Sequence, residues 1–416
     1  MFKSLKSLWS PKNKDIRKRI VFTLLALAIF AIGNTITVPG TKAITKDLGF
    51  LEYLNAISGG GLKQFSIFGL GVMPYISASI VVSILQMDII PYFTDLKNDG
   101  AKGRQKLNQI TRYLGIFVAF IQGVAMTIAF GISNNTMEIM KTALIMTAGT
   151  SFLLWLGDRI TQKGIGNGVS LIIMAGIIST VPRMFLDAYT ALIINSSNLF
   201  IGILSYSLFI LAYIAIIVGV IFVEMSERRI PIQYANQTTS AYGARQTYIP
   251  FKLNSAGVMP VILASAVTSI ISLIANLIKN DGFKSFVEKY INYTTPVGFV
   301  LYMILIFLFG FFYTILQANP EELSKNLNRN GGYIPGIRPG KDTTEYVTSV
   351  LKKLTLVGTI FLAILAGMPI IFANISGLPT SVSIGGTGIL IVVGVALETY
   401  KQLESSLVNR TYQGRK

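Results

Sequence analysis

Long apolar stretches alternate with short polar ones along almost the whole of this chain. Ten of the apolar stretches are long enough, or nearly long enough, to cross a lipid bilayer as helices. They lie at 20–36, 72–90, 113–132, 143–156, 169–181, 199–223, 256–277, 297–316, 354–372 and 383–397. The pattern therefore predicts an all-α membrane protein with ten transmembrane helices.

The segment between the first two stretches breaks this pattern. Residues 58–68 are rich in glycine and serine, and Gly69, Gly71 and Pro74 follow before the second stretch is under way. A half-helix that enters a membrane and breaks must lie inside protein or beside water, because lipid cannot hydrogen-bond the free backbone groups. We therefore predict a re-entrant half-helix here and a pathway through the protein.

Composition agrees with this class and excludes several others. Hydrophobic residues make up 52% of the chain and charged residues 13%, with a mean hydropathy of +0.59, which excludes a soluble fold. The sequence has no cysteine and no histidine, so disulfides, thiolate nucleophiles, histidine bases and the commonest metal ligands are absent together. We expect no enzyme activity, no cofactor and no metal site.

The distribution of basic residues predicts the orientation in the membrane. With the N-terminus in the cytoplasm, eight of the 36 lysines and arginines fall outside, and these are Lys42, Lys46, Lys63, Lys141, Arg183, Lys279, Lys284 and Lys289. Cytoplasmic loops carry the excess of positive charge, so both termini are expected in the cytoplasm of a multi-pass cell-membrane protein. The basic segment before the first span lacks a small-residue cleavage site, so that span is expected to be retained.

The spans and the loops between them suggest how the chain is divided. No sequence repeat is visible, but ten spans divide evenly into two halves of five, as in proteins built from inverted halves. The predicted parts are a cytoplasmic N-terminal segment (1–19), an N-terminal half (20–181), an external hinge loop (182–198), a C-terminal half (199–397) and a cytoplasmic tail (398–416). The long cytoplasmic loops at 224–254 and 317–353 suggest either a docking platform or a linker.

The spans carry almost no charge, and charged residues such as Asp88, Asp158 and Glu398 lie at their ends. Ion-coupled pumps place ionisable groups near the middle of the membrane, so this pattern favours a conduit with an apolar lining. Two pairs of aliphatic residues, Val72 with Ile76 and Val169 with Ile173, are each one helical turn apart. Such side chains can gate a pore by excluding water, although ordinary helix packing produces the same spacing.

Several runs of residues resemble the SecY family of bacterial protein-conducting channels. They occur in the family's order over nearly the whole chain and lie at 65–68, 73–80, 155–161, 164–168, 249–260, 319–321, 332–340 and 385–387. The resemblance implies two halves that close like a clamshell around an hourglass pore. It also implies a plug after the first span and a side gate between spans 2 and 3 on one side and 7 and 8 on the other.

The resemblance assigns roles to particular residues. The constriction ring would be formed by Val72, Ile76, Val169, Ile173, Ile262 and Ile391. The plug, at about 58–68, would include Gly59, Gly60, Gly61, Leu62, Lys63, Gln64 and Phe65. Polar contacts near the gate would come from Asn167 and from Ser83 and Ser265, although each serine fits a packing role equally well.

The resemblance also implies partners. The long cytoplasmic loops would dock the ribosome and the SecA ATPase, while SecE and SecG would complete the complex. Signal sequences, unfolded preproteins and membrane lipid would meet the pore and its gate. Arg338, which lies between two Pro-Gly pairs, is the main docking candidate because rigid turns would present its guanidinium at little entropic cost. Weaker candidates are Arg228, Arg229, Arg245 and Lys252.

The chain departs from the family pattern at three places. Ala31 stands where the family usually has arginine, Ser83 stands where it has glutamine, and the loop at 234–248 is poorer in basic residues. The expected function is the channel of the general secretory pathway, which moves unfolded preproteins and releases transmembrane segments sideways into lipid. An accessory channel for specialised substrates is the first alternative. A small-solute secondary transporter is the second, and the charge-free spans count against it.

Overall fold

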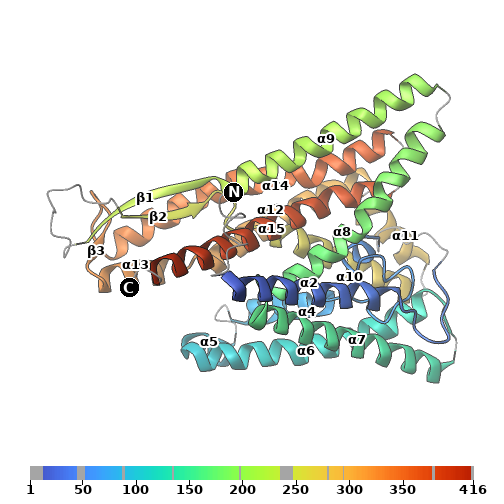
Figure 1. Ribbon diagram of the computed structural model, residues 1–416, viewed down its shortest axis with the longest axis horizontal. Helices are drawn as coiled ribbons and strands as arrows, with labels where there is room; N and C mark the ends of the chain where they lie inside the picture. The colour runs from blue at the N-terminus through green and yellow to red at the C-terminus, as the bar shows by residue number, and fades with distance from the viewer. Residues whose placement is uncertain are drawn as a thin grey trace.

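The computed structural model describes residues 13–44, 52–86, 90–133, 135–195, 198–234, 247–278, 281–293, 295–376 and 380–413. Helices dominate it, and each of the ten predicted spans lies on a different helix (Figure 1). These helices are α2 (Lys14–Thr35), α4 (Met73–Leu85), α6 (Gly100–Ala129), α7 (Thr136–Lys163), α8 (Gly168–Tyr189), α9 (Leu199–Met225), α10 (Met259–Leu277), α12 (Pro296–Ala318), α14 (Lys341–Ser376) and α15 (Thr380–Gln413). The prediction of a helical multi-pass membrane protein is confirmed.

One of the span helices, α4, is too short to cross a membrane by itself. Among the described residues, six segments are long and apolar enough to cross a membrane by themselves, namely Gly100–Ala129, Thr136–Lys163, Gly168–Ile194, Leu199–Met225, Pro296–Arg329 and Lys341–Phe372. The apolar helix Met73–Leu85 has 13 residues, so it is roughly 20 Å long and shorter than a hydrocarbon core. α4 is therefore too short to cross by itself, and the irregular segment before it, 58–72, is packed into the bundle.

α4 and α10 share a four-residue sequence at their starts. Gly-Val-Met-Pro occurs at 71–74 before and within α4, and again at 257–260 before and within α10. Both glycines have a positive φ, 57° at Gly71 and 60° at Gly257, and in both helices a proline stands in the first turn, where its missing N–H costs nothing. α4 and α10 are the second spans of their halves, so this repeat, which sequence inspection missed, supports the two-fold division of the chain.

The predicted plug segment, 58–68, differs from a half-helix. The helix α3 (Glu52–Ile57) ends one residue before it, and Ser58–Val72 is a series of turns with a β-bridge between Thr37 and Ser66. Left-handed backbone conformations at Gly59, Gly60 and Phe65, with φ values of 72°, 83° and 50°, are incompatible with a helix. The re-entrant segment is therefore a folded loop.

The long loops are more ordered than the sequence indicated. β1 (Glu227–Tyr234) lies between β2 (Thr247–Lys252) and β3 (Gly332–Tyr333) in an antiparallel sheet, beside α13 (Pro320–Arg329). The sheet, α13 and the start of α14 share an apolar core whose buried members are Ile230, Ile232, Phe251, Leu327, Ile334, Val347 and Leu351. We call this unit the sheet platform. The prediction of an all-helical protein missed these strands because they are short and because buried and exposed residues alternate along only part of each strand.

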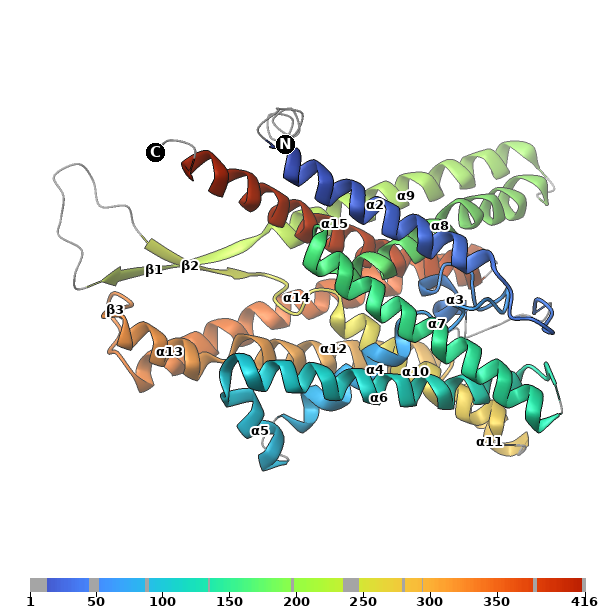
Figure 2. The same cartoon turned by 60° about the horizontal axis from the view of Figure 1, so that its bottom comes forward.

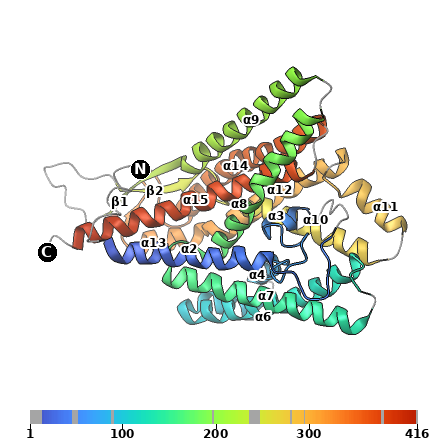
Figure 3. The ribbon, with the colours of Figure 1, turned by 45° about the vertical axis from the view of Figure 1, so that its right-hand side comes forward.

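The two ends of the bundle differ in what they carry. The sheet platform, the start of α2 and the end of α15 lie at one end, while α11 (Asp281–Tyr290), the end of α8 and the start of α9 lie at the other (Figures 2 and 3). The region 182–194 is helix rather than the predicted loop, because α8 runs to Tyr189 and a π-helix, η3 (Thr190–Ile194), follows it. The region predicted as a tail likewise continues α15 as far as Gln413. The short helix α5 (Pro91–Asn98) precedes α6.

Candidate functional site

The six ring residues proposed from the resemblance lie in one apolar cluster. Val72 and Ile76 come from the start of α4, Val169 and Ile173 from the start of α8, Ile262 from α10 and Ile391 from α15. Five of them are buried, with exposed fractions of 1 to 5%, and Val169 is partly buried against them. The fold thus places aliphatic side chains from both halves in one apolar core, which also includes aromatic residues such as Phe30 and Phe209.

Local sequence explains how α8 presents its pair. Asn167 caps the helix, and its Oδ1 accepts hydrogen bonds from the backbone N–H groups of Val169 and Ser170 at 3.1 and 3.4 Å. A Cβ at Gly168 would lie 1.9 Å from the carbonyl oxygen of Gly157 on α7. Only glycine permits this approach, so α8 starts directly against α7 and its first turn faces the cluster.

Val258 is a further residue of this cluster that the sequence analysis did not name. It stands before Met259-Pro260 at the start of α10 as Val72 stands before Met73-Pro74 at the start of α4, and each valine is the N-cap of its helix. Val258 is partly buried against the same cluster, beside Gly394 on α15, where an added Cβ would lie 3.4 Å from its side chain. The repeated Gly-Val-Met-Pro is the signal that would have found it.

The plug segment is packed into the bundle beside this cluster. Leu62 and Phe65 are 1% and 0% exposed, in a second apolar cluster with Met126 of α6 and Met146 of α7. Lys63 is half-buried and Gln64 is exposed. Phe68 joins the first cluster and stacks on Phe30 and Phe152, with ring centroids 6.3 and 5.8 Å apart. The segment is therefore seated by its aromatic and aliphatic side chains.

The four helices predicted to form the side gate pack against one another. The three residues predicted to supply polar contacts there, Ser83, Asn167 and Ser265, each bond to a different partner. α10 packs against α4 and α6 of the other half and against α12 of its own. Ser265 of α10 shares a buried 2.9 Å hydrogen bond with the Tyr302 hydroxyl of α12. The hydroxyl of Ser83 donates to its own helix, at the carbonyl oxygen of Ser79, 2.7 Å away. Asn167 is on none of these four helices.

We expect Tyr302→Phe to weaken the contact between α10 and α12, because it removes one partner of a buried hydrogen bond worth about 1 kcal/mol. A double-mutant cycle of thermal unfolding with Ser265→Ala measures this coupling, which should be about 1 kcal/mol. Ser83→Ala is the control, since its hydroxyl bonds only its own helix. A coupling near zero between positions 265 and 302 would contradict the assignment.

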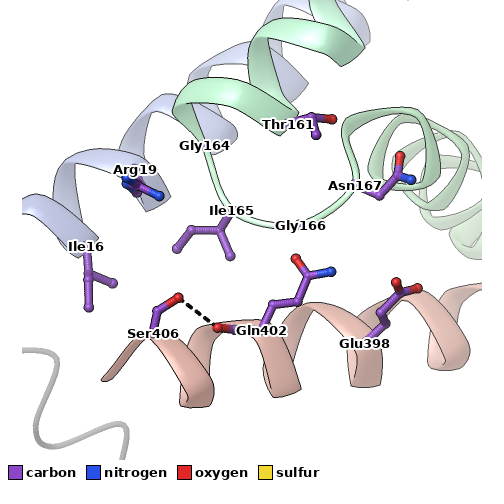
Figure 4. Close-up of a pocket in the computed structure, with 10 residues that line it drawn as sticks. All are labelled: Ile16, Arg19, Thr161, Gly164, Ile165, Gly166, Asn167, Glu398, Gln402 and Ser406. Atoms are coloured by element: carbon purple, nitrogen blue, oxygen red, sulfur yellow. Dashed lines mark hydrogen bonds between the residues drawn. The ribbon is translucent and has the colours of Figure 1, made fainter. Parts of the chain in front are cut away.

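Asn167 borders a polar cavity of about 540 Å³ at the end of the bundle where α2 begins (Figure 4). The cavity lies between the start of α2, the loop from α7 to α8, and α15. Its lining residues are Ile16, Arg19, Thr161, Gly164, Ile165, Gly166, Asn167, Glu398, Gln402 and Ser406. Asn167 thus lies where the N-terminal half faces α15, and not between the helices of the predicted side gate.

The sheet platform carries Arg338 on a well-anchored turn. Gly336 and Gly340 have φ values of 81° and 103°, which glycine adopts easily. The Thr343 hydroxyl donates to the Arg338 carbonyl oxygen at 2.9 Å, and the Ser324 hydroxyl donates to that of Gly340 at 2.8 Å. The backbone is therefore held by α13 and α14, while the Arg338 side chain is exposed.

The other basic candidates lie on the strands of the same platform. Arg228, Arg229 and Lys252 are exposed. The Arg229 guanidinium donates to Glu227 at 2.7 Å, which raises the pKa of Arg229, and it lies 4.7 Å from the centre of the Tyr248 ring. Within the described residues, Arg228 makes neither of these two contacts. Arg245 lies outside the described residues.

Solved structures with a similar fold are protein-conducting channels. One, described as "The structure of a protein conducting channel", has a TM-score of 0.67 at 21% identity and covers 94% of this chain and 92% of that one. Sec61 from the canine ribosome–channel complex matches at a TM-score of 0.63 and 19% identity, with the same coverage. The fold of this chain is thus similar to that of solved protein-conducting channels.

Sequence comparison identifies the family. The SecY family profile matches residues 66–400. The protein translocase subunit SecY of Bacillus subtilis is 45% identical over 429 residues, covering 100% of this chain and 99% of its own, and that of Staphylococcus aureus is 43% identical, covering 97% of each. The chain belongs to the SecY family, and it is a channel subunit rather than an enzyme.

Proposed function

We propose that this chain is the pore subunit of the general secretory translocase of a bacterial cell membrane. It moves unfolded preproteins across the membrane and releases hydrophobic segments sideways into lipid. The observations that carry the proposal are that the six aliphatic ring residues, from α4, α8, α10 and α15, all belong to one larger apolar core, and that Phe68 of the plug segment belongs to the same core. Aliphatic side chains that meet at a narrow point exclude water and ions without binding them.

The physical properties of the ring suit a polypeptide. Such side chains have no fixed hydrogen bonds, so they can separate around a passing chain and close again behind it. A signal sequence shifts the closed and open populations by binding better to the open gate between α4 with α6 and α10 with α12. Through that opening a sufficiently apolar segment reaches lipid.

The partners follow from where charge is presented. The sheet platform would be cytoplasmic, with both termini, and would dock the SecA ATPase or the ribosome through Arg338 and the exposed strand arginines. Two similar folds come from structures described with ribosomes, canine Sec61 and the yeast Ssh1 complex, the latter with a TM-score of 0.65 at 14% identity. SecE and SecG would complete the membrane complex.

Crosslinking tests whether a secretory chain passes the ring. We expect a photo-activated residue at Ile391 to trap a preprotein stalled by a folded C-terminal domain, because the ring must touch whatever crosses it. The same probe at Ile214 on α9, which is 56% exposed, is the control and should label lipid instead. Equal labelling of the preprotein at the two positions, or none at Ile391, would contradict the function.

The accessory-channel alternative keeps one observation in its favour, the weakly basic sequence at 234–248. Depletion of the chain in its host separates the two roles. General failure of secretion supports the housekeeping function, and loss of a single exported product supports the accessory one.

A further inference from the structure

The side chain of Asn34 connects the end of α2 to both ends of the plug segment. Its Nδ2 donates to the carbonyl oxygens of Ser58 at 2.5 Å and Gly59 at 3.0 Å, and its Oδ1 accepts from the Ser66 hydroxyl at 3.3 Å. Asn34 is 6% exposed, and Ser58 and Ser66 are 1% and 0% exposed. The buried amide of Asn34 thus bonds both ends of the loop 58–66, and the Ser179 hydroxyl of α8 is a further donor to the Gly59 carbonyl oxygen, at 3.4 Å.

The chemistry of these contacts requires a side-chain amide. Two carbonyl oxygens need donors and a hydroxyl needs an acceptor, and asparagine supplies both on one short side chain. The surrounding glycines are shaped to it. A Cβ at Gly61 would lie 2.1 Å from the Asn34 Oδ1, and a Cβ at Gly59 would lie 2.5 Å from its Nδ2. These glycines therefore admit Asn34 as well as making the segment flexible.

The closed plug also contains a strained residue that has to be held. Phe65 has a φ of 50°, which is rare for a bulky side chain, and its ring is fully buried. Its carbonyl oxygen accepts from the Val38 N–H at 2.9 Å, and the Ile67 N–H donates to Ile36 at 2.9 Å. The plug is thus bonded to the residues directly after Asn34, so the outer end of α2 forms one side of its seat.

We propose that Asn34 is the latch that holds the plug in its seat, and that its release from Ser58, Gly59 and Ser66 frees the plug during translocation. The inference rests on the proposed function. Loss of the amide takes this donor from the buried Ser58 carbonyl and leaves the Gly59 carbonyl with the longer contact to Ser179, so the closed seat is destabilised. Once the plug moves into a water-filled pathway, water replaces the amide. Asn34 is a positioning residue that does not line the ring.

Ion leak through reconstituted translocase tests the latch. We expect Asn34→Ala and Asn34→Asp to raise the resting leak by about tenfold or more. Asp should have the larger effect, because a carboxylate donates no hydrogen bond and repels the two carbonyls. Both variants should also export preproteins with defective signals. Thr35→Val is the matched control, since the Thr35 hydroxyl is exposed and bonds its own helix at Ile32.

A second variant disturbs the hydrogen bonds of Asn34 without changing Asn34 itself. Gly61→Ala places a methyl group where the Asn34 Oδ1 and the Ser66 hydroxyl lie, 2.1 and 2.6 Å away, so it should leak in the same way. Gly219→Ala, which meets nothing within 4 Å, is its control.

A disulfide separates plug release from misfolding. Thr37 and Ser66 are β-bridge partners, and the chain has no cysteine of its own. Thr37→Cys with Ser66→Cys, added to Asn34→Ala, should suppress the leak when oxidised and restore it when reduced. The proposed role of Asn34 would be overturned if the Asn34 variants leaked no more than Thr35→Val while wild-type translocase exported preproteins normally. Wild-type translocase that exports no preprotein would instead overturn the proposed function.

Discussion

Replacing Ile391 by asparagine is expected to open the resting channel to ions and to admit preproteins with poor signals. Ile391 is 1% exposed within the aliphatic cluster. An amide left there without a partner costs about 1–3 kcal/mol in the closed state. Because water solvates the amide in the open state, the open population should rise about ten- to a hundredfold. Conductance of planar bilayers and export of a signal-defective reporter measure the two effects.

Two variants serve as controls for this result. Ile391→Leu keeps an aliphatic side chain of the same volume and should leave the seal nearly intact. Ile262→Asn should reproduce the leak from another helix, α10, because Ile262 is 3% exposed in the same cluster. Unchanged ion leak and unchanged signal selectivity in both asparagine variants would count heavily against the ring.

Reversing the charge at Arg338 is expected to block transport driven by SecA. The turn is anchored at Thr343 and Ser324, so the variant changes the exposed side chain and leaves the backbone in place. Loss of a charge-assisted hydrogen bond costs about 1.5–3 kcal/mol, which corresponds to a loss of affinity of roughly ten- to a hundredfold. Translocation into inverted vesicles and stimulation of the SecA ATPase are the measurements for Arg338→Glu.

The control for Arg338 lies on the same platform. Arg329 is exposed in the last turn of α13, and Arg329→Glu makes the same change of charge near the same surface. If general attraction to a basic surface is what matters, both variants should lose the same activity. If Arg338 makes a specific contact, only the Arg338→Glu variant should lose most of the transport activity. Normal transport by Arg338→Glu would remove this residue from the docking site.

The sequence pattern predicted the helices well and the irregular segments poorly. Spans such as 199–223 and 297–316 need nothing but their own apolar length to be recognised, because lipid forces each backbone group to bond within its helix. The segment 58–68 obeys no such constraint. Its turns depend on Asn34 and on the strand-like residues after α2, which lie more than twenty positions away in the sequence.

The sheet platform gives a similar lesson at the other end of the bundle. The sequence indicated the two long loops as a possible docking surface but did not indicate the strands within them. These strands are short, with eight residues in β1, six in β2 and two in β3. Such strands become stable only when β1 pairs on both edges and buries Ile230 and Ile232 against α13 and α14. That pairing joins loops from different parts of the chain.

Apolar length and ordered family motifs are local properties, so they identify this protein as a helical membrane channel subunit of the SecY family without any knowledge of its packing. Which side chains meet depends on how the helices pack. The tertiary structure gathered Val72, Ile173 and Ile391 into one cluster, moved Asn167 to a polar cavity beside α15, and brought Asn34 to the plug. These contacts arise from helix packing between distant segments, and the periodicity within a single helix cannot specify its neighbours.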